Sequence, residues 1–117
     1  MASSDNDISY SDLKSLLAKG SVVLVDVRTN DEVARGTIPG SIHIPVGNVG
    51  QDLSLDAAEF QSKFGVSKPP LDCTELVFFC QLGRRGAAAT EKAKSLGFKN
   101  ARNYAGAYKE WSEKEGK

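Results

Sequence analysis

The pattern of hydrophobic and polar positions divides the chain into strand-like apolar segments and segments with helical periodicity. Residues 21–27 (SVVLVDV) form a β-branched run and residues 76–79 (LVFF) form an apolar run. Such runs are typical of strands that are covered on both faces of a sheet. Residues 41–44 and 101–104 predict two shorter strands.

Helical segments alternate with these strands. Leu13, Leu16 and Leu17 fall on one face of a helix over residues 11–18, and Gly20 suits its end. Asp56 and Glu59 have the spacing of a capping box. Further helices are expected over residues 30–34, 56–64, 86–96 and 107–115, whereas residues 46–54 are expected to be irregular.

The alternation of strands and helices predicts the fold class. We expect an α/β fold with one small, mainly parallel sheet of four to five strands and helices on both faces. A chain of 117 residues predicts a single domain over residues 1–117, with a core over about residues 8–114. Ligands of such sheets bind beyond the carboxyl ends of the strands.

Composition and charge narrow the classes of partner and location. The 15 basic and 15 acidic residues cancel, which argues against nucleic acid or an anionic membrane as the main partner. No apolar run approaches the length of a membrane span, and the first residues lack a signal-peptide core, so we expect a cytoplasmic protein. With one histidine and with six residues between Cys73 and Cys80, neither a metal site nor a CxxC redox pair is expected.

The segment after the second apolar strand carries the candidate chemistry. Cys80 ends the strand, and a helix is predicted to begin a few residues later. A thiol reacts as its thiolate, which the positive end of a helix and the charges of Arg84 and Arg85 would favour. Gly83 and Gly86 allow the loop to curl so that backbone N–H groups surround the sulfur. The residues expected to contact the sulfur or the substrate are Gln81, Leu82, Gly83, Arg84, Arg85 and Gly86.

The arginine spacing bears on the type of reaction. Cysteine phosphatases use a Cys-x5-Arg loop, in which the arginine grips the phosphate with two hydrogen bonds. Here Gly86 occupies that position and Arg85 comes one residue earlier. The shorter loop favours a smaller group, such as one sulfane sulfur carried on Cys80. A phosphatase or arsenate reductase on the same fold and a non-catalytic binding module stay open as alternatives.

Three segments resemble the rhodanese family of sulfurtransferases. The loop CQLGRR, residues 80–85, is similar to the family's six-residue Cys-x-x-Gly-x-Arg loop. Residues 24–45 (LVDVRTNDEVARGTIPGSIHIP) resemble its first signature, and residues 103–111 (NYAGAYKEW) resemble its closing Gly-Gly and Trp motif. Thr37 and Ala107 replace a histidine and a glycine that are frequent in the family. We expect neither replacement to touch the loop, and together these segments look like the animal single-domain thiosulfate:glutathione sulfurtransferases.

The resemblance implies a ping-pong sulfur transfer without a cofactor. Cys80 would take a sulfane sulfur from thiosulfate or a persulfide donor and pass it to cyanide, glutathione or another thiol, a protein thiol included. The resemblance also implies that Arg85 orients the anionic donor, with help from Arg84. The residues it implies as supports near the loop are Asp26, Arg28 and Glu32. A monomer is expected.

The remaining candidate residues have structural explanations. His43 alternates with two isoleucines and is expected to be a strand residue rather than a partner of Cys80. Cys73 lies in a predicted loop and is expected to be incidental. Tyr104, Tyr108 and Trp111 are expected to pack the last helix onto the core.

Overall fold

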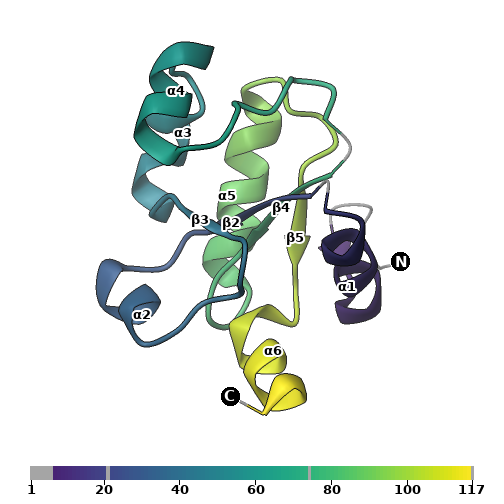
Figure 1. Cartoon of the computed structure of the whole chain (residues 1–117). Coiled ribbons are helices and arrows are strands. Elements are labelled where there is room, and N and C mark those ends of the chain that lie inside the picture. Colours follow the sequence, from purple (N-terminus) through teal and green to yellow (C-terminus); the bar gives the residue numbers. More distant parts are fainter. Residues whose placement is uncertain (1–6, 21, 74, 117) are drawn as a thin grey trace.

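The computed structural model describes residues 7–20, 22–73 and 75–116, and it contains one parallel five-stranded sheet. The strand order is β1-β5-β4-β2-β3, and every pairing is parallel (Figure 1). The strands are β1 (Asp7–Ile8), β2 (Val23–Asp26), β3 (Ile42–His43), β4 (Leu76–Phe79) and β5 (Arg102–Tyr104). The predicted α/β fold is therefore confirmed.

Helices connect the strands. They are α1 (Tyr10–Lys19), α2 (Asn30–Ala34), the 3₁₀ helix η1 (Val46–Asn48), α3 (Val49–Asp52), α4 (Ala57–Phe64), α5 (Arg84–Ser95) and α6 (Ala107–Glu115). The side chain of Ser9 accepts a hydrogen bond from the N–H of Asp12 and begins α1, and Gly20 ends it in the left-handed conformation. The side chain of Asp56 likewise accepts from the N–H of Glu59 at the start of α4.

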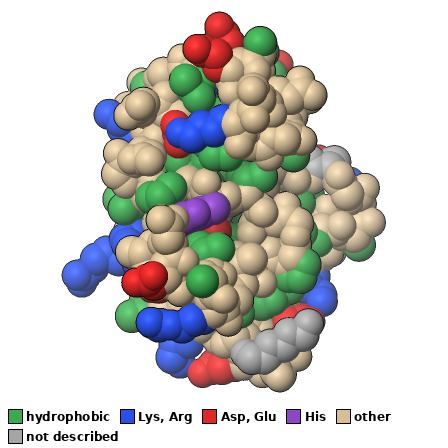
Figure 2. All heavy atoms as spheres, turned by 60° about the vertical axis from the view of Figure 1, so that its left-hand side comes forward, with side chains coloured by type: hydrophobic (Ala, Val, Ile, Leu, Met, Phe, Trp, Pro, Cys, Tyr) green, Lys and Arg blue, Asp and Glu red, His purple; other side chains and the backbone are tan. Residues whose placement is uncertain are grey.

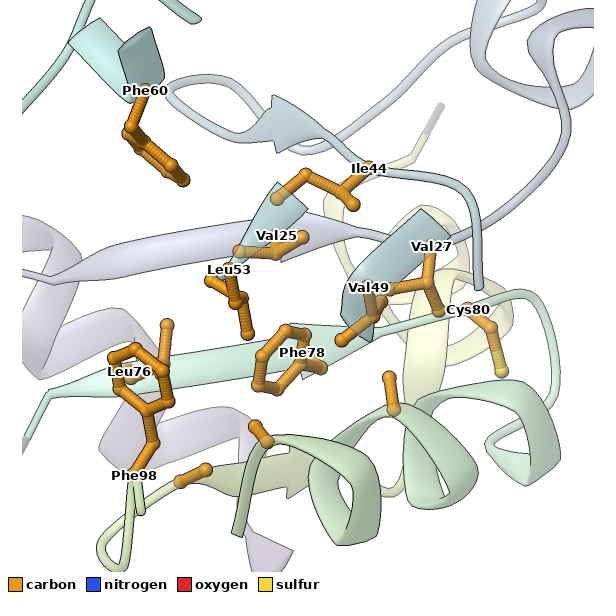
Figure 3. Packing of buried hydrophobic residues seen from close by; sticks show 13 residues of the cluster. Val25, Val27, Ile44, Val49, Leu53, Phe60, Leu76, Phe78, Cys80 and Phe98 are labelled. Carbon is orange, nitrogen blue, oxygen red and sulfur yellow. The ribbon is translucent and has the colours of Figure 1, made fainter. Parts of the chain in front are cut away.

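Alternate side chains of the central strands point into two hydrophobic clusters on opposite faces of the sheet. Leu76 and Phe78 of β4 belong to one cluster, which α3, α4 and α5 cover (Figure 3). Val77 and Phe79 belong to the other cluster, which includes side chains of α1 and α6. Strand β4 is buried on both faces and therefore has no polar side, which explains its continuous apolar run LVFF. Helices cover both faces, as predicted.

The aromatic side chains near the C-terminus pack mainly as expected. Tyr104 is fully buried and Trp111 nearly so, in the cluster that α1 and α6 cover. Tyr108 is half-buried and packs against the same cluster, but its ring also lies 4.2 Å from the guanidinium carbon of Arg28.

Four local expectations need correction. Strand β1 was not predicted, because two residues at a sheet edge are too short to show alternation. The segment expected to be irregular contains η1 and α3, and the first residue of α3, Val49, and the residue that caps its end, Leu53, are both buried. Thr29, rather than Asn30, caps α2, and its side chain forms a full capping box with Glu32. Helix α5 begins at Arg84, two residues earlier than expected.

The backbone at the start of α6 is strained. Ala107 has φ of +63°, and among the described residues it is the one non-glycine with a positive φ. The left-handed conformation costs an L-residue with a Cβ about 1–2 kcal/mol. The side chain of Ala107 is fully buried, so the conformation is held by packing.

We predict that Ala107→Gly leaves stability nearly unchanged, because relief of the left-handed conformation offsets the loss of a buried methyl group, which costs about 0.8 kcal/mol. Ala89→Gly is the matched control, since Ala89 is also buried but lies inside α5. It should destabilise by about 2 kcal/mol through lost burial and lost helix propensity. Urea unfolding measures the free energy of unfolding of both variants, and an equal loss of stability in the two would contradict strain at Ala107.

Candidate active site

Cys80 lies directly after β4, at the carboxyl end of a central strand, where the chain turns into α5. Figure 3 shows Cys80 at one edge of the hydrophobic cluster, with its sulfur beside the loop that leads to α5. Its side chain is only 1% exposed. A cavity of about 450 Å³ nevertheless borders it, lined by Cys80, Leu82, Arg84 and Arg85. This volume falls in the range of small-molecule sites.

The loop brings a backbone donor to the sulfur. The N–H of Gly83 donates a hydrogen bond to Sγ of Cys80 over 3.0 Å. Gly83 is the N-cap of α5 and has φ of +107°, and a Cβ there would lie 2.9 Å from the carbonyl oxygen of Ala105. Both the conformation and the close approach therefore require glycine. The sequence predicted that the amides of residues 81–86 converge on the sulfur; within the described chain, the bond to Sγ comes from Gly83.

No side chain caps the start of α5. The first N–H groups of a helix have no partner within the helix and carry a partial positive charge. At α5 these groups belong to Arg84, Arg85 and Gly86, next to Cys80 in the loop. They are therefore available to an anion held at the sulfur.

Three bonds hold the carbonyl groups of the loop from the opposite side. The N–H of Tyr108 donates to the carbonyl of Cys80 over 2.8 Å, and the N–H of Lys109 donates to that of Gln81 over 3.1 Å. Nδ2 of Asn103 donates to the carbonyl of Gly83 over 3.2 Å. Bonds from β5 and α6 therefore fix the backbone of the loop on both sides of the residue whose N–H reaches the sulfur, Gly83. The sequence did not identify these three residues as supports of the loop, because two of them act through the backbone.

A buried ion pair supports the first part of the loop. Arg28, which is 2% exposed, donates from Nε and Nη2 to the carboxylate of Asp26, with a shortest distance of 2.8 Å. Its Nη1 donates to Oε1 of Gln81 over 3.1 Å, and its Nη2 also donates to the carbonyl of Gly36. The pair that was expected near the loop thus contacts it through Gln81.

The two departures from the family pattern lie next to residues that support the loop. The hydroxyl of Thr37 donates to Oδ2 of Asp26 over 2.6 Å, so Thr37 is connected to the loop through Asp26 and Arg28. Ala107 immediately precedes Tyr108, whose N–H bonds the carbonyl of Cys80. Both positions are linked to the loop through other residues, so the expectation that neither touches it is not contradicted.

A second ion pair connects α2 with α5. Nη1 and Nη2 of Arg85 donate to the two carboxylate oxygens of Glu32 over 2.6 and 2.9 Å. Hydrogen bonding by Arg85 lowers the pKa of Glu32 to about 2, and the same bond with Glu32 raises the pKa of Arg85 above its usual value. Arg85 lines the cavity, but its two terminal nitrogens are already engaged. Arg84 is exposed at the same cavity, and none of the ion pairs of the described residues involves it.

The other candidate residues lie outside the sulfur's immediate surroundings. Nε2 of His43 donates to the carbonyl of Arg28 over 2.7 Å, so this nitrogen is engaged with the backbone. Cys73 is half-buried and packs against the cluster that α5 covers. Among the residues that the structure describes, no group of three His, Cys, Asp or Glu side chains could hold a metal ion. Within the same residues, no helix is long and apolar enough to span a membrane.

Comparison with known proteins assigns the fold to a family. The profile of the Rhodanese-like domain matches residues 9–114. The chain belongs to the rhodanese family. This confirms the resemblance seen in the sequence.

Individual relatives match nearly the whole rhodanese domain. Thiosulfate:glutathione sulfurtransferase from Homo sapiens is 52% identical over 108 residues, which are 92% of this chain and 94% of that protein. The protein of the same name from Saccharomyces cerevisiae is 37% identical and covers 88% of this chain and 75% of its own length. The solved structure of the human single-domain sulfurtransferase TSTD1 superposes with a TM-score of 0.89 at 50% identity, covering 93% of this chain and 96% of that chain.

In this rhodanese domain, we predict that Gly86→Ala disturbs both the fold and the loop. A Cβ at Gly86 would overlap Oδ1 of Asn103 and would lie 3.3 Å from Cα of Phe79. The helix would move away from the sheet, at a cost of about 1–3 kcal/mol. Gly47→Ala is the matched control, because a Cβ at Gly47 meets nothing within 4 Å, and it should change stability by less than about 0.5 kcal/mol. Thermal unfolding of the two variants tests the close approach, and equal stabilities would refute it.

Proposed function

We propose that this rhodanese domain is a thiosulfate sulfurtransferase that carries a sulfane sulfur on Cys80 and passes it to a thiol such as glutathione. The observation that carries the proposal is the placement of the Cys80 sulfur at the uncapped start of α5, where it accepts the N–H of Gly83 over 3.0 Å. A negatively charged sulfur is stabilised by such donors and by the positive end of the helix. Sulfurtransferase activity in relatives named for thiosulfate and glutathione supports the same chemistry.

The first half-reaction is a displacement at sulfur. The thiolate of Cys80 attacks the outer sulfur of thiosulfate, a new S–S bond forms, and the original S–S bond breaks. Sulfite leaves with the electron pair of that bond, so no external oxidant or reductant is required. The persulfide on Cys80 carries its negative charge on the outer sulfur, which faces the same cavity and the N–H groups at the start of α5.

The second half-reaction returns the enzyme to its starting state. A thiolate of the acceptor attacks the outer sulfur of the persulfide, and Cys80 leaves as a thiolate. Glutathione then becomes its persulfide, and cyanide in the same role becomes thiocyanate. Because the reaction depends on a reduced thiol, a cytoplasmic location suits it, and a protein thiol could serve as acceptor by the same displacement.

Two features of the loop argue against a phosphatase on this fold. The position six residues after Cys80 is Gly86, which has no side chain to grip a phosphate. Arg85, one residue earlier, has both terminal nitrogens engaged by Glu32. The pair of terminal N–H bonds with which Arg85 could grip a tetrahedral dianion is therefore occupied by Glu32. A purely binding role does not explain a cysteine held against backbone donors.

We predict that incubation with thiosulfate adds one sulfur atom to the peptide that carries Cys80, and that glutathione then removes it. Intact-mass measurement followed by peptide mapping is the readout. Cys80→Ser should abolish both the added mass and turnover while leaving the fold intact, since the change is nearly isosteric. Cys73→Ser is the matched control and should retain both. Sulfur found on Cys73, or turnover retained by Cys80→Ser, would exclude Cys80 as the nucleophile.

A further inference from the structure

We propose that Arg84, rather than Arg85, binds the anionic group of the sulfur donor, and that Glu32 sets this specificity by engaging the guanidinium of Arg85. The inference rests on the proposed function, because it assigns the donor subsite of the same cavity. The resemblance to the family's loop implied the opposite assignment, with Arg85 as the main ligand of the donor and Arg84 in support.

The charges around the loop support this assignment. Arg28 is paired with Asp26, and Arg85 is paired with Glu32. Each of these pairs is neutral as a unit. Arg84 is therefore the arginine of the loop region whose positive charge no carboxylate among the described residues balances. An anion that enters the cavity meets one uncompensated guanidinium.

The geometry of Arg85 explains why it is not the primary donor ligand. A guanidinium binds a carboxylate or a sulfonate through the same pair of parallel N–H bonds. At Arg85 the carboxylate of Glu32 occupies this pair of nitrogens over 2.6 and 2.9 Å. A donor that took the same pair of N–H bonds would have to displace the Glu32 carboxylate from them. Glu32 is also fixed by α2, because its side chain accepts from the N–H of Thr29.

The position of Arg84 suits a donor ligand. It is the first residue of α5, its side chain is exposed, and it lines the cavity together with Cys80 and Leu82. Its charge adds to the partial positive charge of the uncapped helix start. When the sulfane sulfur of thiosulfate meets Sγ, the sulfonate end extends away from the buried thiol into this cavity. Arg84 lies there without a competing carboxylate.

The test compares Arg84→Gln, Glu32→Gln and the double variant. Arg84→Gln should raise the KM for thiosulfate about twofold to fivefold with little change in kcat, as expected for loss of one exposed charge contact. Arg84→Lys keeps the charge and should recover most of the loss. Glu32→Gln keeps an acceptor for the N–H of Thr29 but removes the charge that holds Arg85. In the double variant, the released Arg85 should bind the donor. On a logarithmic scale, the KM should then lie about midway between that of the unmodified protein and that of Arg84→Gln.

Two results would overturn the inference. One is an unchanged KM in Arg84→Gln, which would leave Arg84 without a donor contact. The other is a double variant whose KM is worse than that of Arg84→Gln, which would show that the Glu32–Arg85 pair supports the donor directly. Thermal unfolding of each variant accompanies the kinetics, so that a loss of folded protein is not mistaken for a loss of affinity.

A binding measurement separates this inference from the proposed function. Cys80→Ser and the variant with both Cys80→Ser and Arg84→Gln are titrated with thiosulfate while the amide NMR signals of the loop are followed. The inference expects weaker binding when Arg84 is absent, whether or not sulfur transfer occurs. Equal binding by the two proteins would overturn it. The proposed function fails by a different result, namely no sulfur on Cys80 after incubation of the unmodified protein with thiosulfate.

Discussion

The hydrogen bond from the N–H of Gly83 to the sulfur of Cys80 is the interaction on which the arrangement of the site depends. It requires the chain to leave β4, turn within a few residues and enter α5 with its free N–H groups toward the sulfur. Such a turn demands a left-handed residue without a side chain, and a helix that approaches the sheet closely. Gly83 meets the first demand, and Gly86 meets the second by lying against Phe79 and Asn103.

Two ion pairs hold the segments around this loop, and they differ in how far they are buried and screened from solvent. The Asp26–Arg28 pair is almost fully buried, so its desolvation offsets much of its attraction. Further bonds from Thr37 to Asp26 and from Arg28 to Gln81 satisfy the remaining polar groups. The Glu32–Arg85 pair is partly exposed and is correspondingly more screened. Both pairs fix the position of the loop more than they increase the stability of the fold.

The parts of the fold and site that could be predicted from the sequence are those with a local signal. The apolar run before Cys80 and the glycines after it predicted a strand, a turn and a helix in the right order. The resemblance implied that Glu32 lies near the loop, but its pairing with Arg85 could not be predicted, because the two residues are 53 apart and each alone is an ordinary charged side chain. Asn103 and Tyr108 were missed for a similar reason, since their bonds to the loop depend on how β5 and α6 are placed. Local patterns determine elements, whereas the supports of the loop arise from packing across the sheet.

The burial of Cys80 affects the donor and the acceptor differently. Its side chain is 1% exposed, so a donor must bring its reactive sulfur deep into the cavity, beside Arg84 and Leu82. In the proposed reaction, the outer sulfur of the persulfide lies about 2 Å further along the S–S bond. An acceptor thiol then needs to reach only this outer atom, and the side chain of Leu82 at the mouth is 71% exposed and does not close it. We therefore expect the recess to favour small anionic donors and to leave the persulfide of the proposed reaction accessible to larger thiols.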